Sequence, residues 1–274
     1  MHNKNNIPLW KWNLLIIFGT ILFLLLSQLA PAIGSLSNNL WIKSILLFTG
    51  GLCILVLYAA FVKIFEKRQI SELSVKQAFR DLPIGFAIGF LFIAVVVLIL
   101  ALVDVYKIES IHVNWESMLL DFSVLFLVAA SEEVIFRGIM FRMIKDRFTA
   151  FTISSLSFGL MHLWNVDMWT AIAISAEAGF MLAAAYNLRN NLWIPIGIHW
   201  AWNFVSGTVL GLGVSGMAQE SSAIIPEISG PYILNGGSNG FEGSIVTCIC
   251  GVLLGVILLR YGKKLAAKKD ITRI

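Results

Sequence analysis

Long apolar segments recur along the whole chain, and they restrict its fold more than any other feature. Of the 274 residues, 58% are hydrophobic and only 13% are charged, which is typical of an integral membrane protein rather than of a soluble core. About 20 consecutive apolar residues span the hydrocarbon of a bilayer as one helix. We therefore predict an all-α fold, a polytopic membrane bundle of about eight transmembrane helices, with a single integral-membrane domain over residues 1–274.

The predicted spans cover approximately residues 12–33, 40–62, 83–106, 117–140, 148–164, 168–188, 192–212 and 244–261. Residues 70–82 are basic and amphipathic, which predicts a separate helix lying at the membrane interface. Gly85 and Gly89 place small residues at the spacing that favours close packing of membrane helices. An alternative for the first segment is a cleaved signal peptide, because Ala30-Pro31-Ala32 resembles a cleavage site.

The distribution of positive charge predicts the orientation in the membrane. With an even number of spans both termini lie on one side, and every lysine and arginine except Lys43 and Lys107 falls near that side. Cytoplasmic loops carry an excess of these residues, so both termini are predicted to be cytoplasmic. The basic segment from Lys263 to Arg273 adds an affinity for anionic membrane lipid. A net charge of +4 gives no reason to expect a nucleic-acid partner.

Three charged residues, Glu132, Glu133 and Arg137, interrupt the fourth predicted span. A charged side chain at membrane depth costs about 3 kcal/mol or more, so such residues usually face a bundle interior or a wet cavity. Glu133 and Arg137 are four residues apart on a helix and share a face, which predicts an ion pair. Glu132 is rotated about 100° from Glu133, which leaves it freer for chemistry.

Two histidines lie well inside predicted spans, His162 in the fifth and His199 in the seventh. Phe158 and His162 are four residues apart, as are His199 and Asn203, so each pair shares a helix face. At 1.5 Å per residue, Glu132 and His199 fall at similar depths in the cytoplasmic third of the bilayer. His162 falls about 20 Å beyond the start of its span, so that helix must begin outside the bilayer or tilt to join them.

These groups are suited to activating water. A carboxylate accepts a proton from water, and imidazole and amide groups donate hydrogen bonds to a developing oxyanion. Glu132, His162 and His199 also have the composition of a zinc site with an open position. The familiar helical zinc motif, however, places both histidines on one helix, so the metal is undecided. The structural alternatives are an ion-pair network, packing histidines and interhelical hydrogen bonds; Glu177 is expected to be structural or cavity-lining.

The three motifs Glu-Glu-x-x-x-Arg, Phe-x-x-x-His and His-x-x-x-Asn occur in this order on the fourth, fifth and seventh predicted spans. In this respect the chain resembles the CPBP intramembrane proteases, which include type II CAAX prenyl endopeptidases and the bacterial Abi and bacteriocin-immunity proteins. The resemblance covers a motif core at about residues 117–212 and implies an eight-helix bundle with an intramembrane cavity opening toward the cytoplasm. The catalytic residues that it implies are Glu132, Glu133, His162, His199 and Asn203, with Arg137 and Phe158 supporting the site.

The roles that this resemblance implies are specific. Glu132 would be the base that activates water with His162, and His199 and Asn203 would stabilise the oxyanion. The predicted function is an intramembrane endopeptidase, of glutamate or metallo type, that cleaves membrane-associated peptides or lipidated proteins in a prokaryotic plasma membrane. Two alternatives stay open: a non-catalytic bacteriocin-immunity or binding protein, and a small-molecule transporter.

Overall fold

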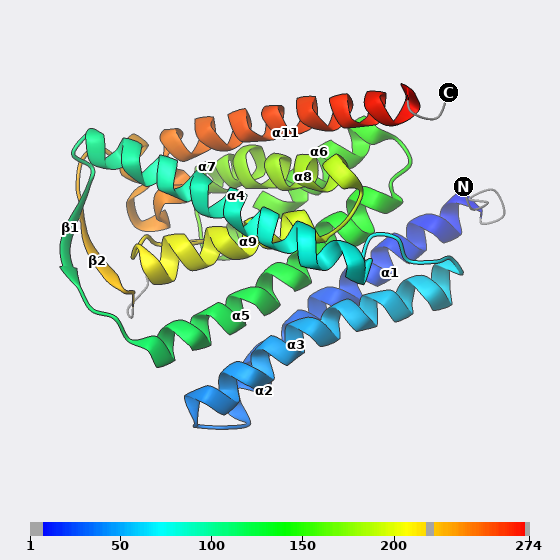
Figure 1. Ribbon diagram of the computed structural model, residues 1–274, viewed down its shortest axis with the longest axis horizontal. Coiled ribbons are helices and arrows are strands. Elements are labelled where there is room, and N and C mark those ends of the chain that lie inside the picture. Colours follow the sequence, from blue (N-terminus) through cyan, green and yellow to red (C-terminus); the bar gives the residue numbers. More distant parts are fainter. Residues whose placement is uncertain (1–7, 218–221, 272–274) are drawn as a thin grey trace.

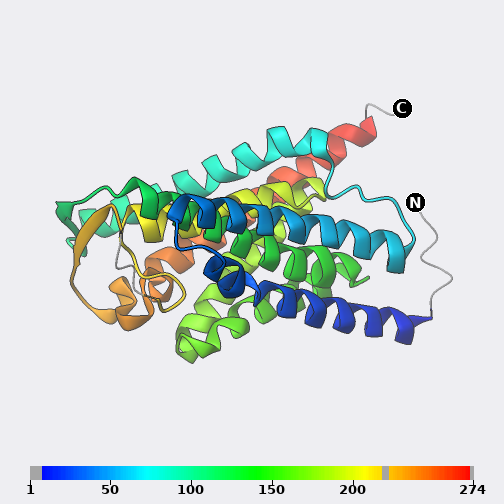
Figure 2. The same ribbon diagram turned by 90° about the horizontal axis from the view of Figure 1, so that it is seen from below.

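A computed structural model describes residues 8–217 and 222–271, a bundle of long helices with a small sheet at one end (Figure 1). Lys4 and Arg273, which belong to the basic ends of the sequence, lie outside the described residues. The start of α1 and the end of α11 lie together at the end of the bundle opposite the sheet, as both views show (Figures 1 and 2). This arrangement agrees with an even number of crossings of the bundle.

The α-helices, in chain order, are α1 (Leu9–Ser27), α2 (Ala30–Ser35), α3 (Leu40–Phe61), α4 (Val75–Leu102), α5 (Trp115–Glu133), α6 (Arg147–Leu160), α7 (Met168–Ile174), α8 (Phe180–Arg189), α9 (Trp193–Asn203), α10 (Tyr232–Asn235) and α11 (Ile245–Ile271). Several are extended by π-helical turns: η2 (Val62–Glu66), η3 (Val134–Phe141), η5 (Ser175–Gly179) and η6 (Phe204–Val209). Short 3₁₀ turns are η4 (Met161–Trp164), η7 (Gly237–Asn239) and η8 (Phe241–Gly243).

Five helical segments are long and apolar enough to cross a membrane: Leu9–Ser35, Leu40–Glu66, Val75–Leu102, Met168–Arg189 and Ile245–Lys264. The other three predicted spans are also helical, but they are the ones that carry the three polar motifs. The protein is therefore an integral membrane protein that is mostly helical, while the total of eight spans stays a prediction.

The predicted interfacial helix at residues 70–82 is wrong. α4 begins at Val75 and continues without a break through Pro83 into the apolar segment. The acidic side chain of Asp81 explains the difference, because it is fully buried and accepts hydrogen bonds from Asn191 (2.6 Å) and Arg189 (3.2 Å). These contacts hold the first turns of α4 against the α8–α9 connection instead of against a membrane surface.

A two-stranded sheet corrects the all-α prediction. β1 (Tyr106–Ile111) and β2 (Ile224–Ile228) pair antiparallel, with Tyr106 opposite Ile228. Of these residues, only Tyr106 falls within a predicted span, and the others lie between the predicted spans. Because the two strands lie more than a hundred residues apart, no local signal marks their pairing, and only the meeting of the α4 and α9 ends brings them together.

Small residues allow α4 and α9 to pack along each other at close distance, as the sequence predicted. A Cβ atom placed on Gly85 would overlap the carbonyl oxygen of Ile194, and one on Gly89 would lie 2.5 Å from that of Ile198. From the opposite helix, a Cβ on Gly197 would overlap the backbone of α4. This glycine seam fixes the position of α9, the helix that carries the third motif.

We expect Gly85→Leu to destabilise the bundle by about 1–3 kcal/mol, because a side chain there must push α9 away from α4. Ala87→Leu, at an exposed position on the same helix, is the matched control and should leave stability nearly unchanged. Thermal unfolding of the detergent-solubilised variants measures both. Equal unfolding midpoints for the two would show that the seam does not limit packing.

A cluster of buried charges ties together the ends of three segments. The hydroxyl of Tyr58 donates to Glu72 at 2.7 Å, Arg68 donates to the same carboxylate at 2.9 Å, and Arg142 pairs with Glu66. Tyr58 lies in α3, Glu66 in η2, and Arg142 directly after η3. Both carboxylates are almost fully buried, so their charges depend on these partners.

The pKa of Glu72 reports this dependence. Burial alone would raise the pKa, but the hydrogen bond from Arg68 and the charges of Arg142 and Arg68 lower it to about 2. A free glutamate has a pKa of about 4.3, so ionised Glu72 stabilises the folded protein above that pH. This contribution is lost as the pH falls from about 4.3 toward 2.

We expect Glu72→Gln to lower the unfolding midpoint by several degrees at pH 7, with an effect that shrinks below pH 4. Unfolding curves recorded over this pH range, with the exposed Glu109→Gln as control, measure the difference. A loss of the same size at every pH would contradict a stabilising role of the ionised carboxylate.

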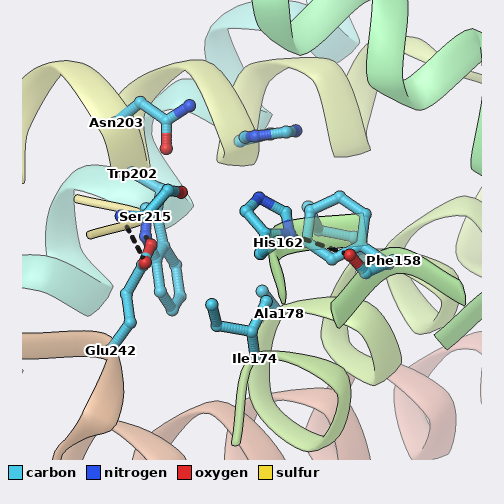
Figure 3. Close-up of a pocket in the computed structure, with 10 residues that line it drawn as sticks. Phe158, His162, Ile174, Ala178, Trp202, Asn203, Ser215 and Glu242 are labelled. Atoms are coloured by element: carbon cyan, nitrogen blue, oxygen red, sulfur yellow. Dashed lines mark hydrogen bonds between the residues drawn. The ribbon is translucent and has the colours of Figure 1, made fainter. Parts of the chain in front are cut away.

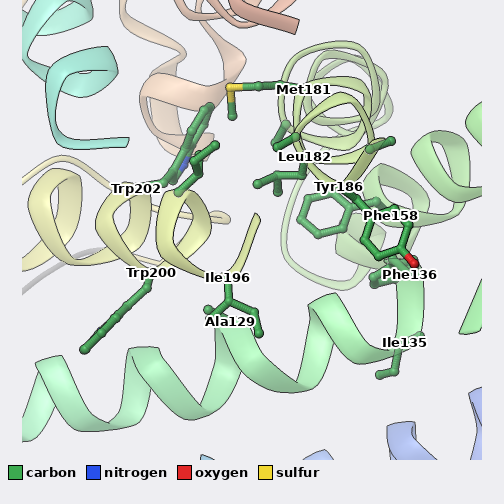
Figure 4. Close-up of a cluster of buried hydrophobic side chains, with 14 of the residues drawn as sticks. Ala129, Ile135, Phe136, Phe158, Met181, Leu182, Tyr186, Ile196, Trp200 and Trp202 are labelled. Carbon is green, nitrogen blue, oxygen red and sulfur yellow. The ribbon is translucent and has the colours of Figure 1, made fainter. Parts of the chain in front are cut away.

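Hydrophobic side chains from α5, η3, α6, α8 and α9 fill the centre of the bundle (Figure 4). The buried members drawn there are Ala129, Ile135, Phe136, Phe158, Met181, Leu182, Tyr186, Ile196, Trp200 and Trp202. Phe136 and Phe158 meet edge to face, with ring centroids 5.1 Å apart. This packing surrounds the polar motifs, so their charged groups must be satisfied by one another.

Candidate active site

Glu133 and Arg137 form the buried ion pair that their four-residue spacing predicts. Arg137 Nη1 lies 2.8 Å from Glu133 Oε1, and both side chains are fully buried. The second guanidinium nitrogen donates to the carbonyl oxygen of Gly179 in η5 at 3.0 Å, and the guanidinium lies 4.5 Å from the ring centroid of Phe158. Arg137 thus joins η3, η5 and α6 and has no access to water.

His199 is attached to this ion pair from α9. Its Nδ1 lies 3.0 Å from Glu133 Oε1, and its Nε2 lies 3.8 Å from Glu132 Oε2. Because an ionised carboxylate only accepts hydrogen bonds, Nδ1 carries a proton and donates it to Glu133. Glu133 is therefore shared between a guanidinium and an imidazole, and it orients His199 rather than facing a cavity.

His162 is fixed by its own helix. Its Nδ1 lies 2.8 Å from the carbonyl oxygen of Phe158, one turn earlier, in the 3₁₀ turn η4. Since a carbonyl oxygen can only accept, Nδ1 carries the proton. The other ring nitrogen points away from Phe158 toward a cavity that His199 and Asn203 also line (Figure 3). The Phe-x-x-x-His spacing thus sets the orientation of the imidazole.

Glu132, His162, His199 and Asn203 line one large cavity of about 570 Å³. This volume is within the range of small-molecule sites. The remaining wall is mostly apolar and comes from α1, α5, η3, η4 and the turn after η6: Leu24, Ser27, Gln28, Leu125, Val128, Ile135, Phe136, Met161, Trp164, Asn165, Val214, Ser215 and Met217. The structure therefore brings residues of all three motifs to a shared space.

The two neighbouring carboxylates differ in their surroundings. Glu133 has no exposed side-chain surface, whereas 26% of the Glu132 side chain is exposed; the Oε2 atoms of both carboxylates are buried and have no hydrogen-bond partner among the described residues. Glu133 Oε1 is occupied by Arg137 and His199. Of the pair, Glu132 is thus the carboxylate that a molecule in the cavity can reach.

A second, much smaller cavity lies behind the first and shares four of its lining residues: His162, His199, Asn203 and Ser215. Its volume is about 10 Å³, close to the smallest space that holds one water molecule. Glu242 closes it on the side of η8 (Figure 3). Burial raises the pKa of Glu242, an effect that the nearby His162 and the hydrogen bonds from Ser215 and Trp202 oppose.

Glu242 is a site residue that the sequence did not predict. It lies between the last two predicted spans, whereas the structure folds η8 back against α9, so that Trp202 Nε1 donates to Glu242 at 2.9 Å. The available signal was that Glu242 is an isolated acidic residue directly before the last apolar span. Its distance along the sequence from the three motifs follows no helical spacing, so it could not be linked to them.

Residues 114–205 match the family described as Type II CAAX prenyl endopeptidase Rce1-like. This region contains all three motifs, and the structure gathers them around one cavity. This match supports the resemblance of the motif region to the CPBP/CAAX protease family. An uncharacterized protein of Mycoplasma capricolum subsp. capricolum (strain California kid) is 25% identical over 240 residues, which cover 74% of this chain and 69% of that protein. No solved structure matches the chain.

Glu177 lines neither of the two cavities. It is fully buried in η5, and neither of its carboxylate oxygens has a hydrogen-bond partner among the described residues. Its Cβ lies so close to Gly251 of α11 that a side chain at that glycine would meet it at 2.6 Å. Glu177 was expected to be either structural or cavity-lining. Its position at the contact between η5 and α11 favours the structural role.

The composition of Glu132, His162 and His199 allowed a zinc site. Among residues 8–217 and 222–271, no group of three or more His, Cys, Asp and Glu side chains is arranged to hold a metal ion. One nitrogen of each histidine is already engaged, by Phe158 and by Glu133. Zinc stays a prediction from composition, and no step proposed below uses a metal.

Exposed lining residues mark an open edge of the large cavity, here called its mouth. They include Trp164 and Met217, 90% and 56% exposed. They belong to η4 and to the turn after η6, and that turn packs against the backbone of Asn165. Asp167, two residues further on, accepts hydrogen bonds from Tyr232 and Asn239, which follow β2.

The position of the mouth bears on two predictions, the side of the membrane on which the termini lie and the side to which the cavity opens. If both termini are cytoplasmic, a mouth at the opposite end of the bundle faces the outer side of the membrane. The resemblance to CPBP proteases implied a cavity that opens toward the cytoplasm. Cytoplasmic termini and a cavity that opens toward the cytoplasm are compatible only if the mouth lies at the same end of the bundle as the start of α1 and the end of α11. In the structure these two helix ends lie at the end of the bundle opposite the sheet.

We expect Met217→Cys to react with a membrane-impermeant maleimide on the side of the membrane opposite to Lys11→Cys, since Lys11 is exposed near the start of α1. The two cysteines are introduced separately after replacing Cys53, Cys248 and Cys250. With cytoplasmic termini, Met217→Cys is labelled in intact cells and Lys11→Cys only after lysis. Labelling of both from one side would contradict the position of the mouth.

Proposed function

We propose that this protein is an intramembrane endopeptidase that hydrolyses peptide bonds of membrane-associated or lipidated peptides in the large cavity. One observation carries the proposal: the partly exposed carboxylate of Glu132 lines the same cavity as His162, His199 and Asn203, while its fully buried neighbour Glu133 is paired with Arg137. A purely structural cluster would pair both carboxylates. The mostly apolar wall suits substrates that enter from a membrane or carry a lipid.

In the proposed reaction Glu132 is the general base. A water molecule beside Glu132 and His162 transfers one proton to the Glu132 carboxylate as its oxygen attacks the scissile carbonyl carbon. The free Nε2 of His162 accepts a hydrogen bond from the other water proton and fixes the direction of attack. When the tetrahedral intermediate collapses, Glu132 returns the proton to the leaving amine, and the base is regenerated.

His199 and Asn203 are the proposed oxyanion stabilisers. As an imidazolium, His199 donates from Nδ1 to Glu133 and from Nε2 into the cavity, and the two carboxylates balance its charge and that of Arg137. The amide of Asn203, one turn further along α9, supplies a second donor. Donors held in a dry site stabilise developing negative charge without reorganising, which is the basis of oxyanion stabilisation.

We expect Glu132→Gln to lower the cleavage rate by a factor of about 10²–10⁴, the usual contribution of a general base. His162→Ala should cause a loss of similar size. Purified wild-type and variant proteins in lipid nanodiscs are incubated with libraries of lipidated and unlipidated peptides, and the products are identified by mass spectrometry. The exposed Glu227→Gln is the matched control. Unchanged cleavage in both site variants would reject this site.

A further inference from the structure

The small cavity between η8 and the motif helices has the size and lining of a site for a single water molecule. Its volume is about 10 Å³, and it is lined by polar groups of His162, His199, Asn203, Ser215 and Glu242. A buried water molecule typically makes about three hydrogen bonds. Cavities with fewer polar neighbours stay dry, so this lining distinguishes the site from a packing defect.

Glu242 is held rigidly at the inner wall. Only 4% of the residue is exposed; its Oε1 accepts from Trp202 Nε1 at 2.9 Å, and its Oε2 accepts from the backbone N–H of Ser215 at 2.7 Å. Each carboxylate oxygen has two lone pairs, so both retain capacity to accept another hydrogen bond. Figure 3 shows the carboxylate beside Ser215 and Trp202, across the small cavity from His162.

The hydrogen-bond requirements of the lining are complementary to water. Nδ1 of His162 is occupied by Phe158, which leaves Nε2 as an acceptor. Glu242 is a second acceptor on the opposite wall. A water molecule between them donates one hydrogen to each and leaves its oxygen free to accept from a donor such as the Ser215 hydroxyl. Glu132 does not line this cavity, although it lines the larger one beside it.

We propose that Glu242 is a positioning residue that stores the hydrolytic water in the small cavity, between its carboxylate and Nε2 of His162. This inference rests on the proposed hydrolase function. A substrate that fills the large apolar cavity excludes bulk water, so the reacting molecule must already be bound. Because the two cavities share His162, His199, Asn203 and Ser215, the stored water moves toward Glu132 while it keeps its hydrogen bond to His162.

Ala178→Val is the decisive variant, because Ala178 lines the small cavity and added methyl groups reduce its volume, while Glu242 and its hydrogen-bond partners keep their side chains. We expect kcat to fall by roughly 100-fold, the effect of misplacing a reacting group by about 1 Å. KM should change little, since the large cavity is intact. Ala176→Val, a partly exposed position in the same π-helical turn that lines neither cavity, is the matched control.

Glu242→Gln, which keeps the size of the side chain but replaces one acceptor by a donor, should show the same split between kcat and KM. If Glu242 only anchored the Ser215 turn, Glu242→Gln would lower the unfolding midpoint and Ala178→Val would retain its kcat. Full kcat in Ala178→Val therefore overturns the storage role.

A high-resolution structure of the wild-type protein provides a readout that is independent of activity. Ordered density within hydrogen-bond distance of Glu242 and His162, lost in Ala178→Val, supports the inference. An empty cavity in an active enzyme overturns the storage role alone. Ordered water in a wild-type protein that cleaves no peptide overturns the proposed function, and the hydrolytic role of this water with it.

Discussion

The buried ion pair between Glu133 and Arg137 is the interaction on which the rest of the site depends. Neither charge reaches water, so each must be compensated inside the bundle, and removing one partner would leave the other uncompensated. The geometry of the pair also organises its surroundings. Glu133 orients His199 of α9, and Arg137 holds the carbonyl oxygen of Gly179 and the ring of Phe158. One pair thus fixes three helices around the cavity.

Close backbone packing fixes the position of α9 relative to the Glu133–Arg137 pair. The glycine seam between α4 and α9 leaves α9 little freedom to move, and His199 and Asn203 keep their places at the cavity wall. π-Helical turns continue α5 after Glu133 and α9 after Asn203, and a third, η5, supplies Gly179 opposite Arg137. Such turns, which often occur at functional sites, change the direction of side chains within a continuous helix.

Much of the site could be predicted because it follows from helix periodicity and from the cost of charge in an apolar environment. Four-residue spacing predicted the Glu133–Arg137 pair and the shared faces of Phe158 with His162 and of His199 with Asn203. The family match over residues 114–205 confirms the resemblance that these motifs carried. Glu242 could not be predicted in this way, because it reaches the site only when η8 folds back against α9 and not through helical spacing.

The sequence by itself determined a helical membrane protein with one paired and one free carboxylate, because apolar length and helical spacing are local properties. The tertiary structure decided what depends on distant contacts: the pairing of β1 with β2, the burial of Asp81 that extends α4, and the gathering of the three motifs around one cavity. These features arise where segments far apart in the chain meet, and no local pattern of residues encodes such a meeting.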